Sequence, residues 1–182
     1  MKYKIIVVGP LPPPIGGIAR YVENIINSKI INNLYDLKIF NTSIPESVRR
    51  FDKRNERNYI SFLSDGWVVG FKILIYVLKT FFSFGIYIYQ QKPKLIHLFT
   101  NSYWGFWRSA IYLLIAKIFG RKIIFHLLNA IDLFWYESGP FSRSMIKYLL
   151  NKLNFLIVQS NGIKLFLKSI SNTPCSVIYN GV

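Results

Sequence analysis

The sequence predicts an α/β domain of the Rossmann-like, doubly wound kind, with about six parallel strands and helices on both faces. Short runs of branched or aromatic residues alternate along the chain with longer segments whose apolar residues recur at helical spacing. Such alternation gives a parallel sheet with right-handed crossovers. The composition agrees, because 52% of the 182 residues are hydrophobic and 17% are aromatic. This length suits one domain over residues 1–182.

The individual elements follow from these runs. The expected strands are Lys4–Val8, Asp36–Phe40, Leu95–Phe99, Lys122–Leu127, Phe155–Gln159 and Ser176–Tyr179. The expected helices are Gly17–Lys29, Trp67–Tyr89, Trp104–Phe119, Phe141–Lys152 and Asn161–Ser169. Because ligands of such sheets bind at the carboxyl ends of the strands, we expect the functional residues in the loops that follow the strands.

One polar segment, Asn41–Ser64, interrupts this pattern and is rich in arginine and lysine. We interpret it as a solvated loop, with a dedicated anion or lipid contact as the alternative. The formal net charge of the chain is +15, so we expect attraction to an anionic partner. A nucleic acid is not the expected one, because no known nucleic-acid-binding motif occurs.

The segment Trp67–Tyr89 is apolar enough to raise the question of a membrane span. Lys72 and Lys79 are seven residues apart and fall on one polar helical stripe, and a lysine near the middle of a bilayer is costly. The first interpretation is a core helix with one wet edge. A helix on the membrane surface is the second, and a full span is the third.

The loop from Gly9 to Gly17 is the most informative segment. It follows the first strand, contains three consecutive prolines ending at Pro14, and leads through Gly16 and Gly17 into a helix. Prolines hold a loop open, and residues without Cβ let a ligand approach the amides at the positive helix end. The loop matches neither a dinucleotide-binding fingerprint nor a P-loop. It predicts a site for a phosphate or a sugar hydroxyl, with a structural turn as the alternative.

Two histidines fall toward the carboxyl ends of expected strands. His97 and His126 are each placed where an imidazole can bond a substrate hydroxyl or act as a base. A histidine on a strand is also compatible with a packed core residue, and this alternative stays open for both. Asp132 and Glu137 are the only carboxylates that follow an expected strand end, so a pair of catalytic acids is not expected.

Other chemistries lack the residues they need. No cluster has metal-ligand spacing, so no metal is expected, and no Gly-x-Ser-x-Gly marks a serine nucleophile. Cys175 is the single cysteine, which excludes an internal disulfide and suits a reducing cytoplasm. The apolar run near the N-terminus is shorter than the core of a signal peptide, so export is not expected.

Four motifs together resemble the N-terminal half of a retaining, family 4 glycosyltransferase of the GT-B architecture. Residues 12–18 resemble the proline–glycine loop of that family, and residues 96–98 resemble its third-strand histidine motif. Residues 157–160 resemble the strand that ends in a serine, here Ser160. Residues 178–182 resemble the Asn-Gly-Val signature, here Asn180 and Gly181, at the hinge into the second domain.

The resemblance implies an acceptor-binding domain that works with a donor-binding domain. The acceptor would be a glycan or a lipid-linked molecule, and the co-substrate would be a nucleotide-sugar, with no other cofactor. Pro14, Gly16 and Gly17 would face the donor diphosphate or the acceptor. His126 would be the catalytic candidate, and the acceptor cleft would be lined by four residues: His97, Asn129, Asp132 and Ser160.

Two features depart from the pattern of the family. Leu128 stands where relatives commonly carry the second histidine of a His-x-His-Gly motif. The chain also stops at Val182, where the donor domain would begin, so we expect it to be inactive alone or to work with a C-terminal domain in a separate chain.

Location follows from charge and resemblance together. Basic charge and aromatic helices favour the cytoplasmic face of the inner membrane, with peripheral contact to anionic lipid. The alternative function is a non-catalytic basic module that binds an anionic membrane surface or a partner protein.

Overall fold

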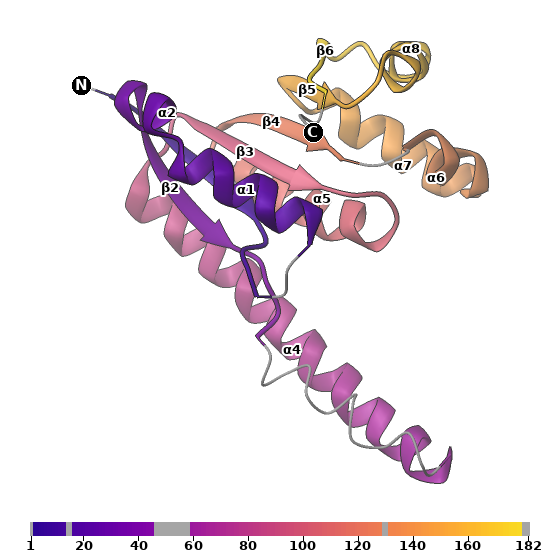
Figure 1. Ribbon diagram of the computed structural model, residues 1–182. Helices are drawn as coiled ribbons and strands as arrows, with labels where there is room; N and C mark the ends of the chain where they lie inside the picture. The colour runs from indigo at the N-terminus through magenta and orange to yellow at the C-terminus, as the bar shows by residue number, and fades with distance from the viewer. Residues whose placement is uncertain (1, 14–15, 46–58, 129–130, 180–182) are drawn as a thin grey trace.

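Six parallel strands form one sheet in the order β2-β1-β3-β4-β5-β6, which confirms the expected fold class. The computed structural model describes residues 2–13, 16–45, 59–128 and 131–179, and of residues 59–71 it describes the backbone only. Figure 1 shows the sheet with helices packed around it. The strands are β1 (Tyr3–Gly9), β2 (Tyr35–Asn41), β3 (Leu95–Thr100), β4 (Lys122–Leu127), β5 (Phe155–Val158) and β6 (Cys175–Val177). The helices are α1 (Gly17–Asn27), α2 (Lys29–Leu34), α4 (Tyr59–Gln91), α5 (Trp104–Ile118), α6 (Ile131–Glu137), α7 (Pro140–Asn151) and α8 (Asn161–Ile170).

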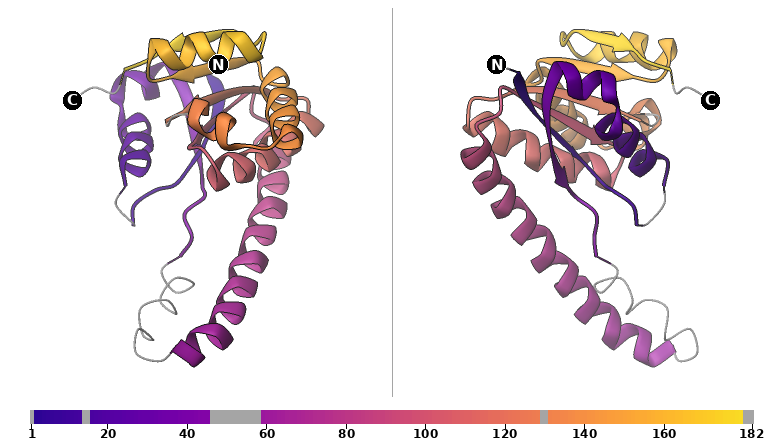
Figure 2. Two further views of the ribbon diagram at one scale, coloured as in Figure 1. Left: turned by 90° about the vertical axis from the view of Figure 1, so that its right-hand side faces the viewer. Right: turned by 60° about the vertical axis from the view of Figure 1, so that its left-hand side comes forward.

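The direction of each crossover decides which face a helix covers. The connection from β1 to β2 runs toward one edge of the sheet, whereas every later connection runs toward the other edge. Since such crossovers are right-handed, α1 lies on one face, and the helices of the later connections lie on the opposite face. Figure 2 shows α1 and α4 on opposite sides of the sheet. The chain therefore changes face between β1 and β3, which are neighbours in the sheet.

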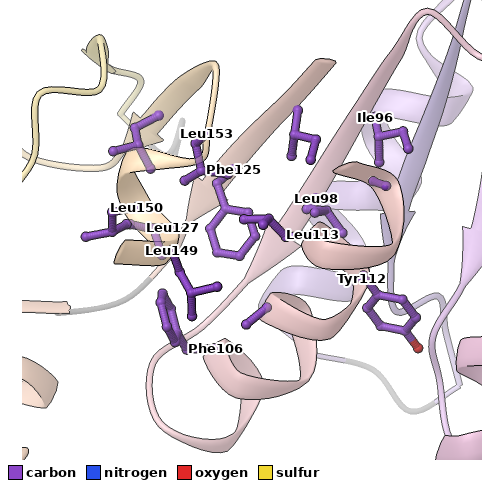
Figure 3. Packing of buried hydrophobic residues seen from close by; sticks show 14 of the residues in the cluster. Ile96, Leu98, Phe106, Tyr112, Leu113, Phe125, Leu127, Leu149, Leu150 and Leu153 are labelled. Carbon is purple, nitrogen blue, oxygen red and sulfur yellow. The ribbon is translucent and has the colours of Figure 1, made fainter. Parts of the chain in front are cut away.

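The core has one large and one small cluster of buried side chains. The large cluster packs alternate residues of β1, β3 and β4 against α4, α5 and α7, and part of it is drawn in Figure 3. Ile96, Leu98 and Phe125 are fully buried there, as expected for a parallel sheet. The small cluster, on the face covered by α1, contains Val7, Val22, Phe99 and Leu128.

A glycine at the end of β1 lets α1 pack closely on the sheet. A Cβ atom built on Gly9 would lie 2.8 Å from Cγ2 of Val22 in α1 and 3.4 Å from Cβ of Phe99 in β3. A contact of 2.8 Å is well below the usual separation of carbon atoms, so a side chain here would push α1 outward. Gly9 thus fixes the position of the helix whose N-terminus borders the site described below.

Four details differ from the expected elements. The first helix ends at Asn27, because Ser28 has an extended backbone and its hydroxyl caps the short helix α2 by accepting from the amide of Ile31. Helix α6 was not expected, because seven residues give little periodicity. The last strand ends at Val177, before Ile178 and Tyr179.

The fourth difference is α4, which begins at Tyr59 and so includes residues expected in the polar loop. Its 33 residues correspond to a length of about 50 Å at 1.5 Å per residue. Figure 1 shows that α4 runs well beyond the strand ends. It packs on the core through Phe84 and Ile88, as expected, but its exposed part is wider than one edge, because only 17% of the window Lys72–Gln91 is buried. By length and composition alone, this stretch is one helix apolar enough to cross a membrane.

Candidate functional site: a cavity between strands β1 and β3

A cavity of about 350 Å³ with polar lining residues lies beside the predicted loop, at the carboxyl ends of β1 and β3. These two strands lead into helices on opposite faces, and a sheet opens a crevice where its connections diverge in this way. The cavity is lined by Pro10, Gly16, Gly17, Ile18, Ala19, Phe99, Thr100, Asn101, Gly105, Arg108 and Ser109. One wall therefore comes from the loop and first turn of α1, and the other from the end of β3 and the start of α5.

Gly16 and Gly17 are exposed, and a Cβ built on either has no heavy atom within 4 Å. Gly16 is the N-cap of α1, with an extended backbone and no side chain capping the helix. The first amides of a helix have no partner within it and carry the positive end of its dipole. The open space over the glycine pair therefore gives a ligand access to these amides.

The loop before the glycine pair is fastened to the end of β2. The amide of Leu11 donates to Oδ1 of Asn41 at 3.1 Å and to Oγ of Ser43 at 2.9 Å. The hydroxyl of Ser43 in turn donates to the carbonyl of Leu11 at 2.6 Å. These bonds hold the first part of the loop against the end of the neighbouring strand.

Arg108, in the second turn of α5, supplies positive charge to the cavity. Its Nη1 donates to the carbonyl of Thr42 at 3.4 Å, which is a long bond. Its Nε is buried and has no hydrogen-bond partner among the described residues, and no carboxylate of those residues forms an ion pair with it. Burying such a donor unpaired is costly, and the same side chain lines the cavity.

Polar groups at the turn between β3 and α5 complete the wall. Oδ1 of Asn101 would lie only 1.5 Å from a Cβ on Gly105, so the asparagine occupies the space that glycine leaves free. The turn contains Tyr103 with a φ of 58°, a conformation that non-glycine residues adopt at a cost. Thr100 and Ser109 are buried and present small hydroxyl-bearing side chains to the cavity. The cavity as a whole combines hydroxyls, an amide, a cation and helix-terminal N–H groups.

The two histidines lie under α1 and do not line this cavity. Their rings are parallel, with centroids 5.6 Å apart, and both stack with Phe99. Tyr21 of α1 meets His126 edge to face at 5.2 Å. The alternation of residues explains this, because His97 and Phe99 share one face of β3, and Phe99 is paired in register with His126.

Their surroundings keep both imidazoles neutral. Burial lowers the pKa of His126 to about 4, and burial together with His126 lowers the pKa of His97 to about 3. Neither ring nitrogen of His126 has a hydrogen-bond partner among the described residues, and the same holds for Nε2 of His97. The packed-core alternative describes this geometry, and the expected catalytic role of His126 stays a prediction.

The other sequence candidates are spread along the sheet edge. Asp132 lies in the first turn of α6 and has a buried Oδ1 without a partner among the described residues. Ser160 is the N-cap of α8, and its hydroxyl accepts from the amide of Ile163 at 3.2 Å. Neither lines the cavity. Pro14, Asn129, Asn180 and Gly181 lie outside the described residues.

In the described part of the chain, no group of three or more histidines, cysteines and carboxylates is arranged to hold a metal ion. The positive charge at this cavity comes from Arg108 and the helix amides.

The sequence predicts the wall of the cavity formed by Gly16 and Gly17, but not the wall formed by the end of β3 and the start of α5. Asn101, Gly105 and Arg108 follow β3 within one short stretch, but the apolar periodicity of α5 drew attention to its core face. The sequence signal for this wall is its position, because Asn101, Gly105 and Arg108 directly follow β3, the strand that neighbours β1. Polar residues there face the glycine loop in any sheet of this strand order.

Comparison with known proteins does not identify the chain. No model of a known protein family matches it, and no curated protein matches it. The function has to be argued from the site itself.

Proposed function

We propose that this domain is the acceptor-binding half of a retaining glycosyltransferase, which moves a hexose from a nucleotide-sugar to a hydroxyl of a glycan or lipid-linked acceptor. The observation that carries the proposal is the cavity between β1 and β3, where Gly16 and Gly17 face Arg108. The motifs that resemble family 4 glycosyltransferases support it further, because the proline–glycine loop forms one wall of this cavity.

The chemistry of glycosyl transfer fits such a cavity. The bond between the anomeric carbon and the phosphate oxygen breaks, and a bond to the acceptor oxygen forms, while negative charge develops on the departing diphosphate. Fixed N–H groups and a guanidinium next to that oxygen stabilise the charge without having to reorganise. Arg108 and the first amides of α1 are the groups of the described chain that suit this role.

Small hydroxyl and amide side chains suit the acceptor. Thr100, Asn101 and Ser109 offer donors and acceptors in a cavity that Phe99 closes on one side. A sugar presents the same mixture of hydroxyls and apolar ring faces. We therefore propose that this wall receives the acceptor hydroxyl and that the glycine wall receives phosphate.

The test is equilibrium binding of UDP-glucose, GDP-mannose and a set of oligosaccharides to the wild type and to the Gly17→Trp variant, which fills the open space over the glycine pair. We expect at least one of these probes to bind the wild type and to lose affinity about tenfold or more in the variant. Gly139→Trp is the matched control, because Gly139 also precedes a helix and has nothing within 4 Å of its Cβ position. Equal binding by both variants would contradict the proposal.

The alternative is a non-catalytic module that binds anionic membranes through its basic surface. The exposed apolar residues of α4 favour it, since half of the residues in the window Lys72–Gln91 are exposed. It predicts liposome binding that weakens with salt and is unchanged by Gly17→Trp, together with no sugar or nucleotide binding.

A further inference from the structure

A second cavity, of about 380 Å³, lies between α4 and α5 and is almost entirely apolar. Leu74 and Leu78 of α4 face Trp104 and Ile111 of α5 across it, and buried Val77 also lines it. Its volume is in the lower part of the range for small-molecule sites. The four facing side chains are all substantially exposed, from 41% for Ile111 to 72% for Trp104, so the cavity opens to the outside.

The two cavities meet at Arg108, which lines both of them. The first two turns of α5 form the partition. Gly105 and Ser109 face the polar cavity, whereas Trp104 and Trp107 face the apolar one. Arg108 therefore lies at the junction of a polar cavity and an apolar groove.

We infer that the site takes an amphiphile: a phosphate ester of a long-chain lipid, with its phosphate between Arg108 and the α1 N-terminus and its chain between α4 and α5. The positive charge of Arg108 between the two cavities favours an anionic ligand with an apolar chain. Nε of Arg108 is buried without a partner among the described residues, and no carboxylate lines either cavity. An anionic headgroup pairs with the positive charge of Arg108, and an apolar chain fills the groove behind it.

The surface around the groove fits delivery of such a molecule from a bilayer. Apolar exposed residues continue along both helices past the groove, with Phe82 at 78% and Ile118 at 82% exposed. Soluble proteins rarely display contiguous apolar patches of this kind unless they meet a membrane or a partner. The apolar side of α4 and α5 would rest on the lipid, so that a chain can pass into the groove without crossing water.

The inference rests on the proposed function in one respect, namely that it takes the bound amphiphile to be the acceptor. Binding itself is tested with three probes below their critical micelle concentrations. Inorganic phosphate carries the charge alone, decyl glucoside carries the chain with an uncharged sugar headgroup, and decyl phosphate carries both the charge and the chain. We expect decyl phosphate to bind at least tenfold more tightly than either of the others, and alkyl phosphates to gain up to about fourfold in affinity per buried methylene as the chain lengthens.

Two variants with matched controls assign the contacts. We expect Arg108→Gln to weaken decyl phosphate binding about tenfold or more and to leave decyl glucoside binding unchanged. Arg121→Gln is its control, because Arg121 also has a buried Nε without a partner among the described residues. Arg121 directly precedes β4 and so lies at the amino ends of the strands, away from the cavity at their carboxyl ends. We expect Leu78→Gln to flatten the dependence on chain length, whereas Leu165→Gln, at an exposed apolar position of α8, leaves it intact.

Decyl phosphate binding no tighter than inorganic phosphate in the wild type would overturn the inference, and this readout needs no variant to fold. Equal losses in Arg108→Gln and Arg121→Gln would overturn it as well. If the decyl phosphate experiments fail while Gly17→Trp still abolishes nucleotide-sugar binding, the inference of a lipid phosphate ligand is wrong and the proposed function stands. If decyl phosphate binds as expected and no sugar or nucleotide does, the lipid site stands without the transferase.

Discussion

The stacked pair His97 and His126 makes the stability of this domain depend on pH. In the native state, burial lowers the pKa of His126 to about 4 and that of His97 to about 3, whereas an unfolded histidine titrates near 6.5. Between these values the unfolded chain binds protons that the native chain does not. The free energy of unfolding is therefore fully present above pH 6.5 and falls as the pH is lowered through this window.

The magnitude follows from the two shifts. One pKa unit corresponds to about 1.4 kcal/mol, so the shifts correspond to about 3 kcal/mol for His126 and about 5 kcal/mol for His97. The slope reaches about 1.4 kcal/mol per pH unit for each ring. Because small domains are stable by about 5–15 kcal/mol in total, we expect a large part of the stability to be lost between pH 6.5 and 4.

The assay is urea unfolding followed by circular dichroism at several pH values. His126→Phe keeps an aromatic ring at a position that is 1% exposed and stacked between aromatic neighbours, and it removes the titrating group. We expect the variant to show about half of the wild-type slope between pH 6.5 and about 5, where most carboxylates stay ionised in both states. Parallel curves for the wild type and the variant would refute this view of the pair.

Three further outcomes follow from the packing. Gly9→Ala places a methyl group 2.8 Å from Cγ2 of Val22, so we expect a loss of about 1–3 kcal/mol in urea unfolding, partly recovered by adding Val22→Ala. Phe84 of α4 is fully buried between Phe40 and Tyr112, so Phe84→Ala is expected to cost about 3–5 kcal/mol, and a loss below about 1 kcal/mol would contradict this packing. Arg108→Met keeps an apolar stem and removes an unpaired buried donor, so thermal unfolding is expected at an equal or higher temperature than in the wild type, and a clear decrease would show that the guanidinium stabilises the fold.

Much of the fold could be predicted because the four inner strands β1, β3, β4 and β5 are largely buried. Each strand is a short apolar run bounded by polar or glycine residues, and all six were located within three residues of their observed ends. The short helices α2 and α6 could not be, because six or seven residues give no clear period. The start of α4 was missed because the polar composition up to Ser64 resembles that of a loop.

The site was only half predictable for a different reason. Gly16 and Gly17 stand out because paired glycines after a strand are unusual, and they do line the cavity. Arg108 does not stand out, because its role depends on which strand neighbours β1 and on which face α5 packs. His126 lies near the carboxyl end of β4 as expected, whereas His97 lies in the middle of β3. The residue alternation that turns both rings under α1 became decisive only with the register of β3 and β4 known.

The amides of Gly16 and Gly17 give the most direct test of the cavity as an anion site. Glycine amides fall in a sparsely populated region of the ¹⁵N–¹H correlation spectrum, so they can be followed while pyrophosphate is titrated into the labelled protein. We expect both to shift in a saturable way in the wild type and to respond at least tenfold more weakly in Arg108→Gln, while Gly139, at the start of α7, stays unchanged. Shifts of equal size at all three glycines, or none at Gly16 and Gly17, would contradict an anion site between β1 and β3.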